Sequence, residues 1–408
     1  MKKVLFIEYF FPPLTPHWRS VAFAKYLPEF GWEPVVLSAA ETVSYSKDYH
    51  MLEEIPGGLR VFRVAHREPP RWWQYLRHAL KIAADFPDYY KTWYSPVYKK
   101  AASILRSEKF DLIYTASPTF TAALVAERLG RRFGIPWVAD FFDGWAVNDF
   151  LDRHLDETVV QPIRWLHKRR IRRAERRILE SADKVTVIHP HVRERWQQLH
   201  RIDGAKIEVI TDGYDEAVFR GLRRRKLYDD RITIAFLGSY YPPFREFIER
   251  FCGVVAQTDA KAEVVFIGRG AESVQRLNLP NSTCILHIER RKAIEFGLGA
   301  DFLFLTMPPF AKWTPSKTYD YLRIGKPILA LVPPDGDAAR IVRESKAGFI
   351  LDFDERRMKT QLRALFQGLR EGKLRAFRPN KECVAKFELR RLTHQMAELF
   401  DETVRARD

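Results

Sequence analysis

Residues 314–330 read TPSKTYDYLRIGKPILA, and this stretch decides how the fold is interpreted. Ser316, Lys317 and Asp320 fall at or near the start of an expected helix, which ends at Gly325 before an apolar strand. A helix that opens with a hydroxyl group, an ammonium group and exposed backbone N–H groups is suited to holding an anion. An acid one turn inside can accept hydrogen bonds from sugar hydroxyls. The stretch therefore suits either a nucleotide-sugar site or a capped surface helix packed on a strand.

Outward from this stretch, apolar strand candidates alternate with helical patterns along the chain. A first set comprises residues 4–9, 33–37, 60–64, 112–115, 137–140, 184–188 and 206–210. A second set comprises residues 232–237, 263–267, 283–287, 302–305 and 328–332. Continuous apolar strands separated by helices indicate parallel sheets covered on both faces. We therefore expect two Rossmann-like α/β domains facing a central cleft, with ligands at the carboxyl ends of the strands.

The polar, charge-rich residues 212–231 are typical of a linker between these domains. We therefore expect an N-terminal, acceptor-side domain over residues 1–211 and a C-terminal, nucleotide-sugar-binding domain over residues 232–385. Residues 389–404 are amphipathic. They predict a closing helix, within residues 386–408, that packs back onto the first domain.

The composition is that of a globular protein of 408 residues with 46% hydrophobic and 13% aromatic residues. Its three cysteines lie far apart without metal-ligand spacing, which favours reduced thiols in the cytoplasm. No apolar run approaches the roughly 20 residues that span a bilayer. The N-terminus superficially resembles a signal peptide, but Glu8 interrupts its apolar run and Pro12-Pro13 end it without a cleavage site. We expect a first β-strand there.

The formal net charge is +16, and its densest source is residues 164–177, where eight side chains are Arg or Lys. Ile163, Leu166, Ala174 and Ile178 fall at helical spacing in this segment. A helix of this kind can face anionic lipid, nucleic acid or a polyanionic glycan, or it can be a solvated surface. No helix-turn-helix, zinc-finger, RNP or KH signature accompanies the charge, so we expect no nucleic-acid partner.

Several common chemistries lack their motifs. The sequence Gly268-Arg269-Gly270 lacks the third glycine of a dinucleotide fingerprint, and the loop after the first strand has no glycine, which disfavours hydride transfer. No G-x-S-x-G, H-E-x-x-H or P-loop sequence is present. His189 and His191 have no acid or cysteine partners at metal-binding spacing. We expect no metal and no cofactor.

Taken together in order and spacing, short motifs along nearly the whole chain resemble the retaining family 4 glycosyltransferases of the GT-B fold. The branch that matches best has a P-P-x-x-x-x-x-R first loop and an S-K-x-Y-(D/E)-Y-L motif. The matching segments are FFPPLTPHWRSVAFAKYL, PDYYKTWYSPVYKKA, FDLIYTASP, GIPWVADFFDGW, RRAERRILESADKVTVI, ITDGYDEAVF, ITIAFLGSYYPP and SKTYDYLRIGKPILAL.

The resemblance implies a donor site in the second domain. Asp320 matches the family's ribose-binding acid with one methylene fewer, and Lys312 stands where relatives often have a sugar-facing Glu. Lys317 and Arg245 would clamp the diphosphate, because negative charge builds on it as the glycosidic bond breaks. The remaining donor-binding candidates are Arg19, Gly238, Ser239, Gly268, Ser316 and Thr318.

The resemblance implies an acceptor side in the first domain. Relatives have glycines in the first loop, where this chain has Thr15 and His17, so their side chains become candidates. Asp140 and Asp143 match the acids of a D-x-R-D-x-W pattern. Asp143 would contact sugar or acceptor hydroxyls, or cap a following helix. Trp145 would stack on a sugar or fill the domain interface.

We therefore expect a transferase that passes a sugar from a nucleoside diphosphate donor, UDP by family frequency, to a glycan or lipid-linked acceptor. The family implies retention, front-face attack and no required metal, with Asp143, Arg245 and Lys317 as catalytic residues. Surface polysaccharide synthesis at the inner face of the cell membrane would fit the basic segment and the aromatic residues 67–98. The alternatives are a non-catalytic relative that binds a polyanion or partner, and a sugar-nucleotide hydrolase or epimerase.

Overall fold

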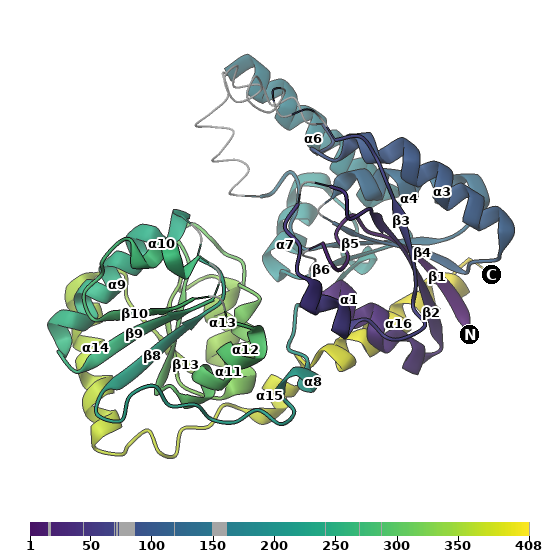
Figure 1. The fold of residues 1–408 in the computed structure, drawn as a ribbon. Coiled ribbons are helices and arrows are strands. Elements are labelled where there is room, and N and C mark those ends of the chain that lie inside the picture. The colour runs from purple at the N-terminus through teal and green to yellow at the C-terminus, as the bar shows by residue number, and fades with distance from the viewer. Residues whose placement is uncertain are drawn as a thin grey trace. The chain divides into compact units, whose positions relative to one another are not determined.

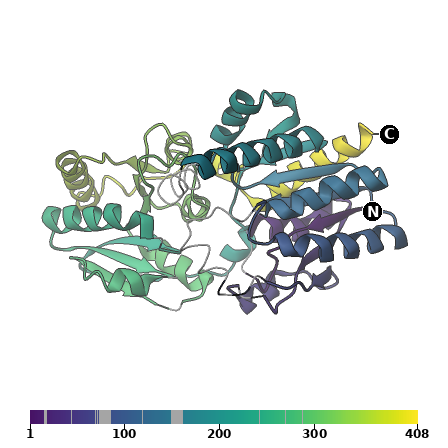
Figure 2. The same ribbon diagram turned by 90° about the horizontal axis from the view of Figure 1, so that it is seen from above.

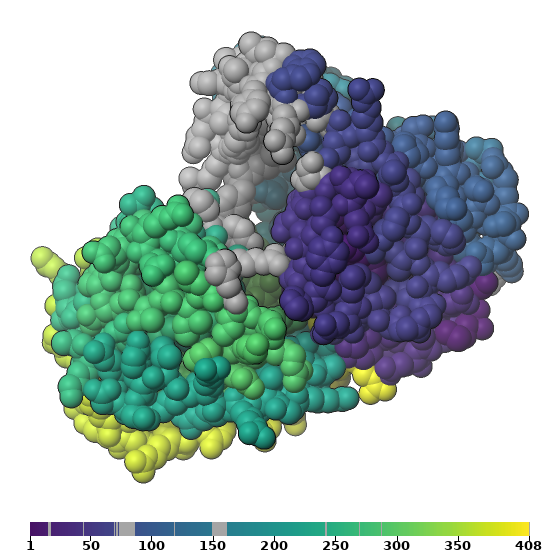
Figure 3. Space-filling model, in the orientation of Figure 1, coloured from purple at the N-terminus to yellow at the C-terminus, as the bar shows by residue number. Residues whose placement is uncertain are grey.

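The computed structural model describes the chain except for residues 15–17, 44, 69, 71, 73–85, 118, 149–160, 241, 269, 287 and 408. Its contacts divide the chain into two compact units (Figure 1). The first unit comprises Met1–Thr211 and Leu389–Asp408, and the second comprises Asp212–Glu388. In the space-filling view the second unit runs from teal through green to yellow-green (Figure 3). The expected cleft between the two domains stays a prediction.

The first unit is built on a seven-stranded parallel sheet in the order β3-β2-β1-β4-β5-β6-β7. Its strands are β1 (Lys2–Ile7), β2 (Trp32–Ala39), β3 (Arg60–Val64), β4 (Leu112–Ser117), β5 (Trp137–Phe141), β6 (Lys184–Val187) and β7 (Ile207–Val209). Its helices are α1 (Trp18–Tyr26), α3 (Tyr94–Ser107), α4 (Phe120–Phe133), α6 (Gln161–Ser181), α7 (Pro190–His200) and α16 (Leu389–Arg405), with 3-10 turns η1 (Leu27–Phe30), η2 (Tyr49–Glu54), η3 (Lys91–Trp93) and η4 (Gly204–Lys206).

Alternate residues of the buried strands face opposite layers of helices, as the continuous apolar runs predict. Leu5 and Ile7 of β1 share a core with α3, α4, α6 and α7. Val4 and Phe6 share the other core with α1 and α16. Figure 2 shows these layers on either side of the sheet. The closing helix expected from the amphipathic pattern is therefore α16, and it packs on the first unit beside α1.

The second unit has a six-stranded parallel sheet in the order β10-β9-β8-β11-β12-β13. Its strands are β8 (Ile232–Leu237), β9 (Ala262–Ile267), β10 (Ser282–Ile285), β11 (Phe302–Thr306), β12 (Ile328–Leu331) and β13 (Gly348–Ile350). Its helices are α8 (Glu216–Phe219), α9 (Arg245–Thr258), α10 (Ala271–Gln275), α11 (Arg290–Gly299), α12 (Lys317–Ile324), α13 (Asp337–Glu344), α14 (Glu355–Arg370) and α15 (Lys381–Ala385), with 3-10 turn η5 (Pro242–Phe244).

All strands expected from the sequence are present, with ends that differ by at most two residues. The structure adds β13, a half-buried edge strand of three residues that was missed because it is too short to show a pattern. Residues 212–231, expected as a linker, instead pack into the second unit. They do so because Tyr214, Val218 and Phe219 are buried in its core.

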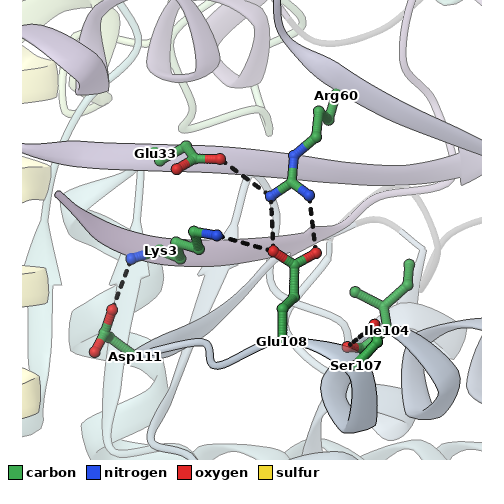
Figure 4. Close-up of polar contacts among 7 residues, drawn as sticks. All are labelled: Lys3, Glu33, Arg60, Ile104, Ser107, Glu108 and Asp111. Atoms are coloured by element: carbon green, nitrogen blue, oxygen red, sulfur yellow. Dashed lines mark hydrogen bonds and ion pairs between the residues drawn. The ribbon is translucent and has the colours of Figure 1, made fainter.

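A charged network ties together the amino ends of three strands in the first unit (Figure 4). Glu108, just after α3, accepts hydrogen bonds from Lys3 at 2.9 Å and from Arg60 at 2.8 and 3.1 Å. Arg60 also donates to Glu33 at 3.0 Å, and the Lys3 backbone N–H donates to Asp111 at 2.7 Å. Hydrogen bonds from Arg60 and then Lys3 lower the pKa of Glu108 to about 2. The network lies at the edge opposite to the carboxyl ends and therefore holds the sheet together without shaping a site there.

Candidate functional site

The order of strands places a candidate ligand site in the second unit. From β8 the chain moves outward through β9 and β10, and then returns to the other side of β8 with β11, β12 and β13. Ligands of open parallel α/β sheets bind outside the carboxyl ends of the strands at such a switch point. Gly238 and Ser239 follow β8 at this edge, and Thr306 ends β11.

A tyrosine holds the two diverging strands at the switch point. Strands β8 and β11 pair directly at Ile234 and Ala235, next to the amino end of β11. Further along, the hydroxyl group of Tyr321 accepts a hydrogen bond from the Leu237 N–H at 2.8 Å and donates to the Phe304 carbonyl at 3.2 Å. Because Tyr321 belongs to α12, these two bonds hold that helix against the ends of the strands.

Lys317, the first residue of α12, lies at this edge. Its ammonium nitrogen is 3.5 Å from the centroid of the Phe236 ring, and a side chain on Gly238 would lie 3.6 Å from it. Among the residues that the structure describes, no carboxylate pairs with Lys317. Burial lowers the pKa of Lys317 to about 7. A desolvated cation without a carboxylate partner is a site for an anionic ligand.

Two glycines leave the backbone beside Lys317 uncovered by side chains. Gly268, after β9, has φ +130° and packs against the backbone of Gly238, where a Cβ would lie 2.8 Å from the Gly238 carbonyl oxygen. Gly238 has φ +100° and donates its N–H to Ile267 at 2.9 Å. Only glycine fits such an approach at residue 268. A ligand can therefore meet backbone at the ends of β8 and β9.

The start of α12 differs in part from the anion-binding helix start that the sequence predicts. The Ser316 side chain makes no capping hydrogen bond and is exposed, so its hydroxyl remains available. The N–H groups of Thr318 and Tyr319 already donate to the carbonyls of Pro315 and Ser316, at 2.9 and 3.1 Å. The Thr318 hydroxyl is buried and has no hydrogen-bond partner in the described part of the chain. Of the side chains at the start of α12, Lys317 and the exposed Ser316 are thus the ones open to a ligand, whereas the unpartnered Thr318 hydroxyl is buried.

Asp320 lies one turn further along α12 and has a partner that the sequence did not indicate. The Arg290 guanidinium, at the start of α11, donates to both Asp320 oxygens at 2.9 and 3.0 Å. Both side chains are partly buried. A sugar hydroxyl would have to share this carboxylate with Arg290 or displace it.

Arg245, expected to clamp the diphosphate, and Lys312, which stands in place of a sugar-facing Glu, both form surface ion pairs. Arg245, the first residue of α9, pairs with Glu249 at 2.7 Å, and its side chain is 60% exposed. Lys312 pairs with Asp335 at 2.7 Å. Exposed pairs of this kind exchange readily with other partners. The geometry therefore brings neither Arg245 nor Lys312 into contact with Lys317.

In the first unit, Arg19 and Asp140 bind each other. Arg19 on α1 donates to both oxygens of Asp140 at 3.0 and 3.1 Å, and both side chains are fully buried. Tyr114 and Thr186 also donate to Asp140, at 2.6 and 2.5 Å. Arg19 further donates to the carbonyls of Ile210 and Thr211. This saturated network ties β4, β5, β6 and β7 to α1, and it leaves neither candidate facing a ligand.

Asp143 follows β5 and is half-buried. Burial raises its pKa to about 6, and the charge of His191, at the start of α7, lowers it in part. An acid that titrates near neutral pH at the carboxyl edge of a parallel sheet suits proton exchange or hydroxyl binding. Of the expected acceptor-side residues, Asp143 is the one whose surroundings best fit that role.

Trp145 is buried and stacks on Phe120, with ring centroids 4.0 Å apart, while Phe86 stacks at 5.5 Å. Glu175 of α6 accepts its backbone N–H at 2.5 Å. Trp145 therefore fills the core of the first unit and has no open face for a sugar. Thr15 and His17 lie outside the described residues.

Sequence reasoning missed Glu8, which follows β1 at the switch point between β1 and β4. It is 2% exposed, and one carboxyl oxygen has no hydrogen-bond partner among the described residues. Burial raises the pKa of Glu8 well above its usual value, and the charge on Asp140 raises it further. The signal was visible, since an acid that interrupts an apolar strand is unusual.

Neither a cluster of metal ligands nor a helix able to span a membrane is found among the described residues. Within those ranges, no three His, Cys, Asp or Glu side chains gather in an arrangement for a metal ion. Over the same ranges, no helix combines the length and the apolar character needed to cross a membrane.

Known proteins resemble this chain in sequence over its first half and in fold over nearly its whole length. Residues 16–213 match the family described as "Glycosyl transferase 4-like domain". Sucrose-phosphate synthase from Thermosynechococcus elongatus is 14% identical with a TM-score of 0.68, covering 100% of both chains. HepE from Anabaena in complex with UDP-glucose is 14% identical with a TM-score of 0.65, covering 98% of this chain and 100% of that one. Starch synthase IV from Arabidopsis thaliana, bound to ADP and acarbose, is 11% identical with a TM-score of 0.61, covering 99% of each. No curated protein sequence matches the chain.

At these identities the likeness concerns the fold, and the fold is GT-B, with two parallel-sheet α/β domains of seven and six strands. The family match independently supports the resemblance to glycosyltransferase family 4 over the first half of the chain.

Proposed function

We propose that the chain is a glycosyltransferase, the activity of the family that its residues 16–213 match, and that its donor is a nucleoside diphosphate sugar. The observation that carries the proposal is the Lys317 ammonium, desolvated and without a carboxylate partner among the described residues, at the switch point of the second sheet. A diphosphate supplies the negative charge that this position lacks. UDP is the first nucleotide to test, since HepE was solved with UDP-glucose.

Each group at the site has a part in this proposal. Lys317 and Ser316 bind the diphosphate, while Gly238 and Gly268 let it approach the backbone. Arg245 joins them by leaving Glu249, and Asp320 binds the ribose beside Arg290. Lys317 stabilises the charge that develops on the leaving diphosphate, and this electrostatic contribution is commonly the largest in catalysis.

We further propose transfer with retention, in which the departing phosphate takes the proton of the acceptor hydroxyl. This step needs the two substrates to be positioned rather than a dedicated base. Asp143 then orients a hydroxyl group, because a carboxyl group that titrates near pH 6 can accept or donate a hydrogen bond. The acceptor is a glycan or a lipid-linked sugar in a surface polysaccharide.

Helix α6 favours an acceptor held at an anionic membrane. Its first turns leave Ile163, Trp165 and Leu166 exposed by 42, 60 and 52%. Arg169 stacks on Trp165 at 5.2 Å, and Figure 1 shows this end of α6 extending beyond the sheet of the first unit. Exposed apolar side chains next to cations are typical of a helix that lies in a membrane interface. The buried side of the helix begins only at Ile171.

The decisive experiment is calorimetric titration with UDP, GDP, dTDP and ADP, repeated for Lys317→Ala. Selective binding of one nucleoside diphosphate that the variant loses would support the proposal and name the donor base. Lys261→Ala, another lysine of the second unit without an ion pair in the described structure, is the matched control and should bind normally. Folded protein that binds none of the four would instead favour a non-catalytic relative. Release of free sugar from UDP-glucose in the absence of an acceptor would favour a hydrolase.

A further inference from the structure

A cavity lies at the end of α12 opposite to Lys317. It has a volume of about 760 Å³, within the range of small-molecule sites. Asp301 and Pro327, which line it, directly precede β11 and β12, and Gly325 ends α12. The cavity is therefore at the amino edge of the second sheet, whereas Lys317 is at the carboxyl edge.

The charged side chains that line the cavity are mostly positive. The cationic side chains are Arg224, Arg323, Lys326, Arg375, Arg378 and Lys381. Asp301 is the only acid among the described residues that line the cavity, and its carboxylate already accepts the Thr233 N–H at 2.9 Å. Such a concentration of like charge costs free energy unless an anion is present.

Most of these cations have no carboxylate partner. Arg323 pairs with Glu216 through two bonds of 2.6 Å, and Arg378 donates to the carbonyls of Arg375 and Phe377. In the described structure, no carboxylate pairs with Arg224, Lys326, Arg375 or Lys381 across this cavity. Lys326 is half-buried; burial and the charge of Arg224 lower its pKa, while the charge of Asp301 raises it in part.

The walls also present apolar surface. Leu322, Leu369, Leu374, Phe377 and Val384 line the cavity between the charged groups. A site for inorganic salt ions would not need such walls, whereas an organic body attached to a charged group does. Arginine forks match phosphate oxygens in geometry as well as in charge.

We propose that this cavity is a binding site for a phosphorylated small molecule that carries at least two negative charges, separate from the donor site. Arg224 and Lys326 hold the phosphate groups. Arg375, between α14 and α15, and Lys381, the first residue of α15, contribute further positive charge, and the apolar walls hold the organic part. The proposal does not depend on the glycosyltransferase activity, since none of these residues belongs to the donor site.

The test is calorimetric titration with sodium tripolyphosphate in the Lys317→Ala background, which removes the donor site. We expect one ion bound per chain. The variant Arg224→Gln/Lys326→Gln should weaken binding by at least about tenfold, the effect of about 1.4 kcal/mol. The matched control is Lys261→Gln/Arg356→Gln, which removes the same charge from the second unit at residues that do not line the cavity. The control should change the dissociation constant by less than about twofold.

The absence of tripolyphosphate binding in Lys317→Ala, or equal weakening in the two double variants, would overturn the proposal. A second arm replaces tripolyphosphate with phosphatidylcholine vesicles that contain phosphatidic acid. Vesicle binding that Arg224→Gln/Lys326→Gln abolishes would identify the phosphate as a lipid headgroup. Binding of tripolyphosphate alone would identify a soluble ligand.

Discussion

The ammonium of Lys317 lies 3.5 Å from the centroid of the Phe236 ring, and no carboxylate in the described structure pairs with it. The aromatic face stabilises the cation only weakly, by about 0.5 to 2 kcal/mol. Burial opposes the charge and lowers the pKa of Lys317 to about 7. The surroundings of Lys317 thus suit an anion, such as the diphosphate of the proposed donor, and we expect the affinity for that anion to depend on protonation of the Lys317 nitrogen.

Binding of UDP-glucose should therefore weaken as the pH rises. The diphosphate diester keeps its charge between pH 6 and pH 8, whereas Lys317 loses most of its proton across its pKa of about 7. We expect the dissociation constant to rise about tenfold over this range. The variant Lys317→Arg stays charged and should show a flat profile. The same slope in both proteins would assign the titration to another group.

Tyr321→Phe should destabilise the protein by about 1 to 3 kcal/mol, because it leaves the buried Leu237 N–H without its acceptor. Urea denaturation measures this change. Tyr240→Phe removes the same atom from a half-exposed side chain and should alter stability by less than about 0.5 kcal/mol. If the two variants lose equal stability, the hydrogen bonds of Tyr321 to β8 and β11 do not contribute to the free energy of unfolding.

If Asp320 binds the ribose, the wild-type protein should prefer UDP to 2′-deoxy-UDP by about tenfold, since a hydrogen bond to a charged group contributes about 1.5 to 3 kcal/mol. Asp320→Asn should lose this preference. Arg290→Gln removes the partner of Asp320 and keeps its carboxylate, so it should retain the preference. Parallel calorimetric titrations with both nucleotides check this, and an unchanged preference in Asp320→Asn would place the ribose elsewhere.

Glu108→Gln should destabilise the first unit at pH 7 by about 1 to 2 kcal/mol, because it weakens the hydrogen bonds of Arg60 and Lys3. The folded pKa of Glu108 is depressed to about 2, so its contribution is present above the unfolded value near 4.3 and is lost as the pH falls through 2. The difference between variant and wild type in urea denaturation should therefore shrink from pH 4 to pH 2. A difference that stays constant would show that the charge is not responsible.

Trp165→Ser should weaken binding to vesicles that contain phosphatidylglycerol by about tenfold, which corresponds to the apolar burial of one large side chain. Leu199→Ser removes another exposed apolar side chain of the first unit, on α7, and should leave binding unchanged. Co-sedimentation at two lipid compositions provides the measurement. Equal behaviour of both variants would exclude α6 as the contact.

The sequence was sufficient for what depends on local patterns. Buried parallel strands are continuous apolar runs, so the strands of both sheets were located, and β13 was missed because Gly348–Ile350 is short and half-buried. Lys317 was identified because its position follows from the start of one helix. That no acidic partner lies beside it among the described residues, by contrast, depends on the whole second unit.

Partners from distant segments could not be predicted. Arg19 and Asp140 lie 121 residues apart in sequence, and only the fold shows that they saturate each other. The same holds for Asp320 with Arg290, and for Trp145 between Phe86 and Phe120. In each case, a residue type that suits ligand binding also suits a buried network.

The return of the chain to its first unit has a consequence for biosynthesis. Helix α16 covers one face of the first sheet, and Asp401 accepts hydrogen bonds from Lys2 and Trp32. A ribosome must therefore translate all of Asp212–Glu388 before the first unit can close, roughly ten seconds or more at about 5 to 20 residues per second. During that interval, the apolar residues that will meet Leu392, Met396 and Phe400 are uncovered. The first unit therefore exposes, throughout that interval, apolar surface that it buries only once α16 has been made.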